Sequence, residues 1–213
     1  MTFTELKERI DNSARKRGAK GEDISIVTVS KGRSVEAMLK LAEEGAEIFG
    51  ESRLQEALLK IPRFPAQNFH FIGRLQSNKI KEAVKHFEMI QSVDNLDAAQ
   101  LINSSANRFG KIQKVMIQVN ISGEKQKGGI LKEYLSDLYK SVVKLPNISL
   151  EGLMMIPPYF DDPEENRLLF REMFKIYKSY TLPYLSMGMS GDFESAVEEG
   201  ANMVRVGSAL FEN

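Results

Sequence analysis

The chain has 213 residues, 42% of them hydrophobic and 27% charged, with 29 Lys and Arg balanced by 29 Asp and Glu. This composition predicts one globular domain with a substantial core, since two full domains would need a longer chain. The zero net charge argues against nucleic acid or an anionic membrane as the main partner, and the lack of cysteine excludes disulfides, thiolate nucleophiles and cysteine-bound metals.

The N-terminal segment is charged throughout and lacks the apolar run of a signal peptide. It predicts a helix, because Thr2 and Glu5 can form a capping box while Phe3, Leu6 and Ile10 fall on one face. No stretch of the sequence reaches the ~18 apolar residues of a membrane span. We therefore predict a cytoplasmic protein that begins with an extra helix.

The rest of the chain repeats one pattern, in which a short apolar run is followed by a turn and then an amphipathic stretch. Strands are predicted over 24–30, 46–49, 69–72, 88–92, 114–121, 149–156, 183–187 and 202–206. Helices are predicted over 35–44, 52–60, 77–85, 96–109, 131–143, 163–180 and 192–199, with a short turn from 208. Because alternating strands and helices pair in parallel, we predict a single (β/α)8 TIM-type barrel over 1–213, of class α/β.

An open doubly wound sheet is the rival fold, because several of the predicted strands are short. Two nucleotide-binding signatures that would favour it are missing from the sequence. No G-x-G-x-x-G follows the first strand, and no G-x-x-x-x-G-K-[ST] occurs anywhere. The barrel therefore remains the better prediction, and its chemistry belongs in the loops that follow the strands.

Lys31 directly follows the first predicted strand, which puts an amine at one end of the barrel. At the rim of an apolar cage, desolvation favours the neutral amine, which is nucleophilic toward a carbonyl. Lys31 is then a Schiff-base lysine. The alternative is a solvated lysine at the start of a surface loop, and the spacing alone leaves both open.

The loops after the seventh and eighth strands are rich in glycine and hydroxyl groups. Met189 and Ser190 lie in the first of them, and Gly207 and Ser208 lie in the second. Free backbone N–H groups at such turns can cradle a phosphate, and barrels often bind phosphate in these two loops. The alternative is that the glycines only form turns or caps.

Arg205 lies two residues before Gly207 on the last predicted strand, so the two residues point to the same side of that strand. A buried arginine needs a partner, which is either a carboxylate of the core or a bound ligand. His70 in the third strand is predicted to be a core histidine with its hydrogen bonds satisfied. We assign it no catalytic role, and we predict no metal site.

Seven segments in one order span nearly the whole chain. They are VSKGRSVE (29–36), FGESRLQE (49–56), HFIGRLQSNK (70–79), NISGEKQKGG (120–129), GLMMIPP (152–158), LSMGMSGDFESAVEEGA (185–201) and VRVGSALF (204–211). In this set the sequence resembles the pyridoxal phosphate homeostasis protein family (YggS/PROSC type), single barrels similar to the N-terminal domain of alanine racemase. The ordered set is far more specific than any one motif.

The resemblance implies that the chain binds pyridoxal 5'-phosphate (PLP), held as a Schiff base on Lys31. It implies that Ser190, Gly207 and Ser208 hold the phosphate, while Arg205 faces the pyridine nitrogen. A permanent cation there disfavours protonation of the ring, which weakens the cofactor as an electron sink.

Two positions depart from the family's usual pattern. Ser52 stands where the family commonly has asparagine, and its shorter side chain would reach the cofactor only through water. Ser208 replaces a threonine and keeps the hydroxyl group. The resemblance therefore implies that Ser208 keeps the family's contact, whereas Ser52 reaches the cofactor only through water.

Racemisation needs acid/base groups on both faces of the cofactor, and in alanine racemase a tyrosine from a second domain serves the face opposite the lysine. No unassigned segment of this sequence is long enough for such a domain. We therefore predict a protein that sequesters, buffers or delivers PLP, with PLP-dependent apoenzymes as candidate recipients. The alternatives are a PLP-dependent racemase of low activity and a PLP-free barrel enzyme that uses Lys31 on a phosphorylated sugar.

Overall fold

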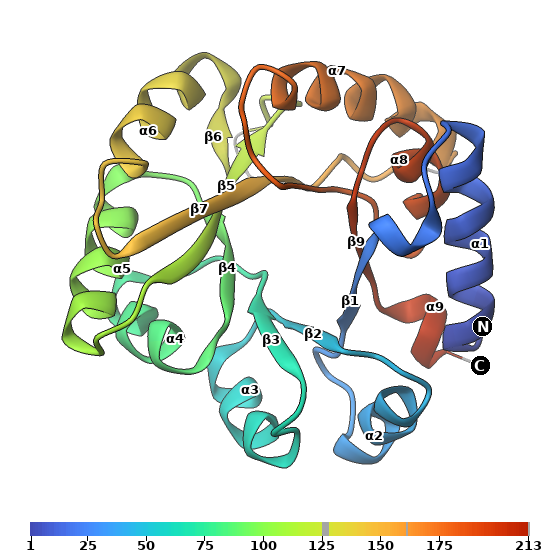
Figure 1. The fold of residues 1–213 in the computed structure, drawn as a ribbon, viewed down its shortest axis with the longest axis horizontal. Coiled ribbons are helices and arrows are strands. Elements are labelled where there is room, and N and C mark those ends of the chain that lie inside the picture. Colours follow the sequence, from blue (N-terminus) through green and yellow to red (C-terminus); the bar gives the residue numbers. More distant parts are fainter. Residues whose placement is uncertain (125–127, 161, 213) are drawn as a thin grey trace.

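The structure is a computed structural model that describes residues 1–124, 128–160 and 162–212. Eight parallel strands form a closed ring because β1 pairs with β9 and β4 pairs with β5 (Figure 1). The ring consists of β1 (Ser25–Val29), β2 (Ile48–Glu51), β3 (Asn68–Phe71), β4 (Met89–Val93), β5 (Gln113–Asn120), β7 (Ile148–Met155), β8 (Tyr184–Ser186) and β9 (Met203–Val206). The predicted (β/α)8 TIM-type barrel is confirmed, and the open doubly wound sheet is wrong.

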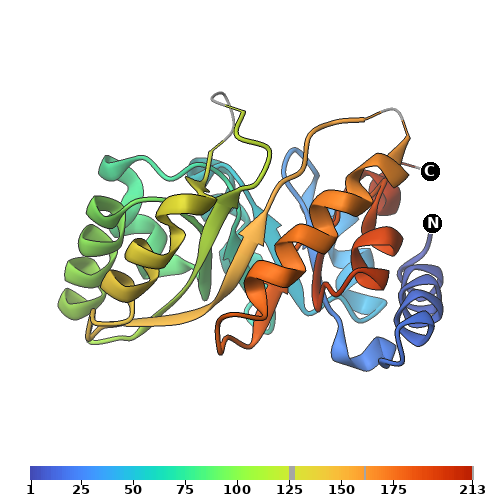
Figure 2. The ribbon, with the colours of Figure 1, turned by 90° about the horizontal axis from the view of Figure 1, so that it is seen from above.

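Helices cover the outside of the ring, as both ribbon views show (Figure 2). They are α1 (Phe3–Lys16), α2 (Val35–Glu43), α3 (Leu54–Lys60), α4 (Ile80–His86), α5 (Leu96–Arg108), α6 (Leu135–Val142), α7 (Arg167–Tyr177), α8 (Phe193–Glu198) and α9 (Ser208–Phe211). Within the described ranges, none of these helices has the length and apolar character needed to cross a membrane.

The extra N-terminal helix is confirmed as α1. Thr2 and Glu5 form the predicted capping box, and Phe3, Leu6 and Ile10 are buried. The helix packs against α8, to which it is linked by two ion pairs, Arg9 with Glu194 and Lys16 with Glu198. The apolar face and the cap therefore set the start of the chain, and the charged face attaches it to the last part of the barrel.

Three predicted helices begin later than the sequence suggested. The segment predicted as a helix over 131–143 opens with strand β6 (Ile130–Leu131) and a 3-10 turn, and α6 starts only at Leu135. Strand β6 pairs with the end of β5. This pairing keeps the backbone extended at Leu131, where the sequence pattern predicted the start of a helix. The helices predicted from 77 and from 163 likewise begin with 3-10 turns, which are common at helix starts.

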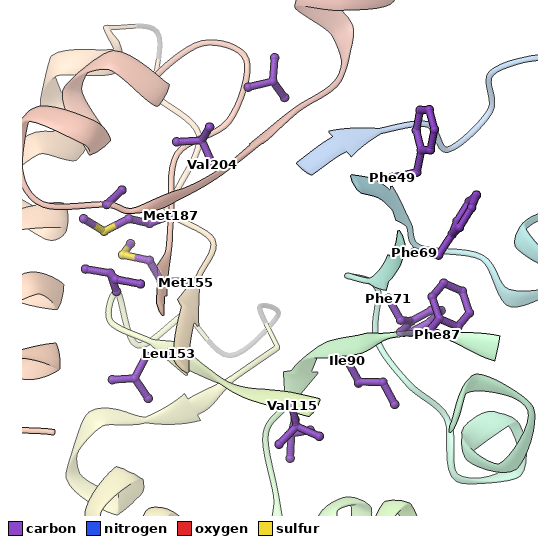
Figure 3. Packing of buried hydrophobic residues seen from close by; sticks show 14 of the residues in the cluster. Phe49, Phe69, Phe71, Phe87, Ile90, Val115, Leu153, Met155, Met187 and Val204 are labelled. Carbon is purple, nitrogen blue, oxygen red and sulfur yellow. The ribbon is translucent and has the colours of Figure 1, made fainter. Parts of the chain in front are cut away.

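The strands separate two buried layers. Aromatic and aliphatic side chains on the outer side of the ring pack against the helices, as the labelled residues of Figure 3 show. A smaller cluster fills the middle of the barrel and consists of Val27, Met89, Met116, Met154 and Met203, with Ile48 and Tyr184 packed against it. Alternation along each strand therefore directs the next inward residues toward the carboxyl end of the barrel.

Several of those next inward positions are polar. His70, Gln91, Ser186 and Arg205 are all buried, and each lies on a strand of the ring. Arg205 comes two residues after Met203, and Gln91 comes two residues after Met89. The barrel thus has an apolar plug below and a polar layer above it, toward the end where the strands lead into their loops.

Candidate functional site

The predicted site residues lie mostly on three adjacent strands. The order of the sheet places β8 beside β9 and β9 beside β1, and the register pairs Val27 with Arg205. Lys31 follows β1, Ser190 follows β8, and Gly207 follows β9. Because all strands are parallel, their carboxyl ends meet at one mouth of the barrel. The prediction that the two glycine-containing loops lie on adjacent strands is therefore confirmed.

Lys31 occupies the corner of a tight turn that ends β1. The backbone N–H of Arg33 donates to the carbonyl oxygen of Ser30 over 3.0 Å, which closes a turn over 30–33. Gly32 has a φ of +70°, the left-handed conformation that the third position of a type II turn requires. Lys31 is exposed, which agrees with the alternative of a solvated lysine at the start of a loop, and its Schiff-base role stays a prediction. The turn carries it out of the wall of the barrel.

A buried ionic cluster lies behind this turn. The Nζ atom of Lys60 donates to the carbonyl oxygen of Ser30 over 2.7 Å, to Oε1 of Glu51 over 2.8 Å, and to Oε1 of Glu56. Oε1 of Glu51 also accepts from the hydroxyl of Ser30 over 2.8 Å, and Oε1 of Glu56 accepts from the N–H of Gly32. The cluster therefore holds the residues on both sides of Lys31.

The two carboxyl groups of the cluster differ in their environment. Burial raises the pKa of Glu51, against the opposing hydrogen bonds from Lys60 and Ser30. Burial also acts to raise the pKa of Glu56, but the hydrogen bonds from Lys60 and Gly32 outweigh it and lower that pKa. The two directions follow from exposure, since Glu51 is fully buried while Glu56 is partly open to water.

Sequence reasoning missed this cluster, although one signal for it was present. Leu54, Ala57 and Lys60 follow one another at intervals of three on α3, and all three are buried. A lysine on the apolar face of a short helix must find partners in the core. Glu56, four residues before Lys60 on the same helix, is one such partner, and its spacing is visible in the sequence.

Beside this turn, at the ends of β8 and β9, backbone amides converge on one hydroxyl group. The Oγ atom of Ser190 accepts from the N–H of Gly207 over 3.0 Å and from the N–H of Ala209 over 3.3 Å. A Cβ atom at Gly207 would come within 3.1 Å of the carbonyl oxygen of Val29 on β1. Ser208 lies between these two amides and is exposed. The loops after β8 and β9 thus bring two backbone donors and two hydroxyls together.

The loop after β8 has its own internal support. The N–H of Met189 donates to Oδ1 of Asp192 over 2.6 Å, and Nδ2 of Asn166 donates to the other carboxylate oxygen over 2.9 Å. Burial raises the pKa of Asp192, against the opposing hydrogen bonds from Met189 and Asn166. These contacts fix the backbone on which Ser190 is carried.

Arg205 is fully buried, and its observed partners are neutral. Nη1 donates to Oγ of Ser186 over 2.6 Å, and Nη2 donates to the carbonyl oxygen of Met155 over 2.7 Å. Among the described residues, no ion pair reaches this guanidinium. Burial lowers its pKa to about 10, with the charge of Asp192 acting in the other direction. Arg205 therefore stays a cation at neutral pH without a carboxylate in direct contact.

A chain of hydrogen bonds continues from Arg205 across the barrel. The hydroxyl of Ser186 donates to Oε1 of Gln91 over 2.8 Å, and Nε2 of Gln91 lies 2.9 Å from Nδ1 of His70. His70 is 3% exposed, and burial lowers its pKa to about 4. The prediction of a core histidine with a hydrogen-bond partner is confirmed. Gln91 and Ser186 are residues that sequence reasoning did not single out.

Ser52 lies at the end of the strand that pairs with β1. It follows β2 and packs closely against Gly73, where a Cβ atom would come 2.4 Å from the carbonyl oxygen of Ser52. It lines a shallow depression with Arg74 and Lys79. Within the described residues, no hydrogen bond joins Ser52 to Lys31 or Arg205. Residues 125–127, inside the motif at 120–129, lie outside the described ranges.

The donors at the mouth suit an organic phosphate better than a metal ion. Its groups are an amine, a guanidinium, hydroxyls and backbone amides, which donate to oxygen anions. In the part of the chain that the structure describes, no group of three or more His, Asp or Glu residues could hold a metal.

A family model and several named proteins match nearly the whole chain. Residues 6–212 match the family described as the alanine racemase N-terminal domain. The pyridoxal phosphate homeostasis protein of Aquifex aeolicus is 38% identical, covering 98% of this chain and 95% of its own length. The Escherichia coli protein of the same name is 33% identical, covering 98% of this chain and 94% of its own.

Solved structures show the same architecture. PipY of Synechococcus elongatus, a structure with PLP bound, has a TM-score of 0.85 and 31% identity, with 97% of this chain and 99% of that chain covered. An alanine racemase of Clostridium difficile has a TM-score of 0.77 at 20% identity, with 100% of this chain and 60% of that chain covered. The second likeness is one of fold alone.

Proposed function

The chain belongs to the pyridoxal phosphate homeostasis protein family, which shares the alanine racemase N-terminal domain, and we propose on that premise that it binds PLP in PLP homeostasis. The family relatives are named for homeostasis rather than for an enzyme activity. PipY, at 31% identity, is a relative whose structure holds PLP. We take residues 1–213 as one PLP-binding domain, because the strands form one continuous ring.

The observation that carries this proposal is the meeting of three kinds of donor at the carboxyl ends of β8, β9 and β1. Lys31 offers an exposed amine, Arg205 a buried cation that forms no ion pair with the residues the structure describes, and Gly207 a backbone amide. PLP has an aldehyde, a ring nitrogen and a phosphate, which call for these three partners in turn. The residues present therefore fit the cofactor.

Lys31 is proposed to bind PLP covalently. A lysine amine condenses with an aldehyde and releases one water, so Lys31 would hold PLP through its aldehyde carbon. The exposed position of Lys31 at the corner of a turn supports this role, since the aldehyde and the leaving water can both reach it.

The loops after β8 and β9 are proposed to bind the phosphate. The N–H groups of Gly207 and Ala209 both point at Oγ of Ser190, which marks a place where two donors converge. Phosphate oxygens accept from such pairs of amides, and the hydroxyls of Ser190 and Ser208 can add further bonds. Met189 contributes its backbone, which Asp192 holds. We retain Ser52 only as a contact made through water.

Arg205 is proposed to face the ring nitrogen of PLP. A guanidinium that remains positive at neutral pH disfavours a second positive charge on a nitrogen beside it. PLP supplies a ring that withdraws electrons from the bonded carbon, and this effect is weaker when the nitrogen is not protonated. Arg205 therefore suits binding and release better than the stabilisation of a carbanion.

We propose a carrier or buffer of PLP, in the cytoplasm, with PLP-dependent apoenzymes as recipients. The names of the family relatives support this role. The second candidate is a PLP-dependent racemase of low activity, because the chain shares its fold with alanine racemase. Exchange of the α-proton of alanine in deuterated water separates the two, because racemisation must exchange that proton while carriage need not.

The experiment that tests PLP binding is visible absorption of the purified protein with added PLP, before and after reduction by borohydride. We expect a Schiff-base band that reduction converts into a stable adduct, and mass mapping should locate that adduct on Lys31. In Lys31→Ala the band should disappear while the melting temperature stays within a degree or two, since this side chain is exposed. A wild-type protein that binds no PLP would overturn the proposal.

A further inference from the structure

We propose that Lys60 is a positioning residue for Lys31, because its buried ammonium group holds the turn from which the Lys31 amine reaches PLP. This inference rests on the proposed function, since it concerns how the same site is prepared for its cofactor. Lys60 lies on α3, outside the wall of the barrel, and does not need to touch the cofactor itself.

The first step of the argument is the number of bonds that Lys60 makes. An ammonium group has three N–H donors, and each of them has a partner here: the carbonyl oxygen of Ser30, Oε1 of Glu51 and Oε1 of Glu56. Lys60 is 5% exposed. A cation that is buried and has all three donors in use is held in one geometry, unlike a lysine on the surface.

The second step is what these partners hold in turn. Glu51 binds the hydroxyl of Ser30, and Glu56 binds the N–H of Gly32. Ser30 thus has both its carbonyl and its hydroxyl in the cluster, and Gly32 has its amide there. Lys31 lies between them and makes no bond of its own to Lys60, Glu51 or Glu56 among the contacts described. Its backbone is fixed on both sides while its amine is left free.

The third step is the balance of charge. Oε1 of Glu51 and Oε1 of Glu56 both lie within hydrogen-bond distance of one nitrogen, so they are close to each other. The neighbouring charge of Glu56 acts to raise the pKa of Glu51, which shows that the two groups interact. Without the cation, two carboxyl groups would repel behind the turn. Lys60 is therefore the group that keeps the cluster together.

A role in barrel stability alone is the competing explanation, and the two differ in what they predict for the turn. We test them with Lys60→Met, which keeps the length of the side chain and removes its donors. The matched control is Lys111→Met. Lys111 is a half-buried lysine that donates to two backbone carbonyls, those of Val84 and Phe87, and it precedes β5 at the opposite end of the barrel.

The first measurement needs no cofactor: amide hydrogen exchange of the unloaded protein at Gly32 and Arg33. Lys60→Met should speed exchange at these two amides by about tenfold or more, because it frees the turn from its support. Lys111→Met should leave both amides unchanged even where it lowers the melting temperature. Equal protection of the turn in Lys60→Met and wild type would overturn the proposal.

The second measurement is the rate of Schiff-base formation with PLP, at a temperature where every variant is folded. Misplacing the Lys31 amine should slow the reaction of Lys60→Met by about tenfold or more, while Lys111→Met reacts like wild type. If the variant forms the Schiff base at the wild-type rate, the inference fails. If wild type itself forms none, the proposed function fails instead, and the exchange measurement still decides the role of Lys60.

A milder variant covers the case in which Lys60→Met does not fold. Glu56 is partly exposed, so Glu56→Ala should fold, and it removes the acceptor for Gly32 together with one partner of Lys60. We expect faster exchange at Gly32 and slower Schiff-base formation, each by a factor of about three to ten. Wild-type behaviour of Glu56→Ala in both measurements would then overturn the proposal.

Discussion

The two sides of the barrel mouth hold their functional groups by different means. On the β1–β2 side, an ionic cluster of Lys60, Glu51 and Glu56 lies behind the turn that carries Lys31. On the β8–β9 side, the cation is Arg205, and its partners are a hydroxyl and a carbonyl. One side therefore uses charge as internal support, while the other keeps its charge available.

This difference follows from what each side is proposed to do. A group that supports a turn must have its own partners satisfied within the protein, because an unpaired buried charge is costly. A group that meets a ligand benefits from partners that orient it without neutralising it. The β1–β2 side fits the first description, and the β8–β9 side fits the second.

The largest expected effect is on stability, and it concerns the two buried cations, Lys60 and Arg205. Lys60→Met should lower the free energy of unfolding by about 3–5 kcal/mol, because it leaves two carboxyl groups without their cation. Arg205→Met should cost only about 1 kcal/mol, since the lost hydrogen bonds to Ser186 and Met155 are offset by relief of a buried charge. Urea unfolding of both unloaded variants measures this, and equal costs would contradict the contrast.

The next effect concerns pH and the chain of hydrogen bonds from Arg205 to His70. In the folded protein the pKa of His70 is about 4, against an ordinary value of 6.5. Between these values the unfolded chain binds the extra proton, so the contribution of His70 to stability is present above pH 6.5 and is lost as the pH falls toward 4. The loss is about 3 kcal/mol.

The measurement is urea unfolding of wild type and His70→Gln at pH 7 and at pH 4. Other groups titrate in the same range, and the difference between the two proteins isolates the histidine. We expect the stability of wild type relative to the variant to fall by about 3 kcal/mol between the two pH values. A difference that does not change with pH would mean that His70 has the same pKa in the folded and the unfolded protein.

A smaller effect tests the phosphate side. Ser190→Ala removes the hydroxyl on which the amides of Gly207 and Ala209 converge. We expect the Kd for pyridoxine 5'-phosphate, which lacks the aldehyde and so cannot bond to Lys31, to rise about tenfold, as for the loss of one hydrogen bond to a charged group. Ser208→Ala, at an exposed hydroxyl, is the matched control and should change the Kd less. Equal changes in the Kd of the two variants would argue against phosphate binding at the place where the two amides meet Ser190.

The smallest expected effect comes from replacing one glycine on each side, Gly32 on the β1–β2 side and Gly191 on the β8–β9 side. Gly32 has a positive φ of +70° and nothing within 4 Å of the place of a Cβ, so Gly32→Ala meets only backbone strain. It should cost about 1 kcal/mol. Gly191 also has open space but no positive φ, so Gly191→Ala should change stability by less than about 0.5 kcal/mol. Thermal unfolding compares the two, and a similar cost would mean that the turn at Lys31 adapts.

The sequence predicted the fold well because its signals are local. Glycines at the ends of helices, such as Gly45 and Gly200, do have the positive φ values that a helix cap uses. Alternation along β9 correctly placed Arg205 inside the barrel, two residues beyond the buried Met203. The late start of α6 was not predictable, because β6 forms by pairing with the end of β5.

The candidate site was predictable only in part. Ser190 and Gly207 were expected together from their motifs, and the structure brings them into contact. The exposure of Lys31 could not be decided from the sequence, since a strand ending in apolar residues does not reveal that a type II turn follows. Ser52, expected from the family pattern, packs against Gly73, and its contact with the cofactor stays a prediction.

By itself, the sequence determined the succession of strands and helices, the inward side of each strand and the family to which the chain belongs. These properties depend on the order and spacing of neighbouring residues. Only the tertiary structure decided that Lys60, 29 positions beyond Lys31, holds the turn on which Lys31 lies. Closure of the barrel sets such contacts, because it brings side chains together by their place in the ring and not by their distance along the chain.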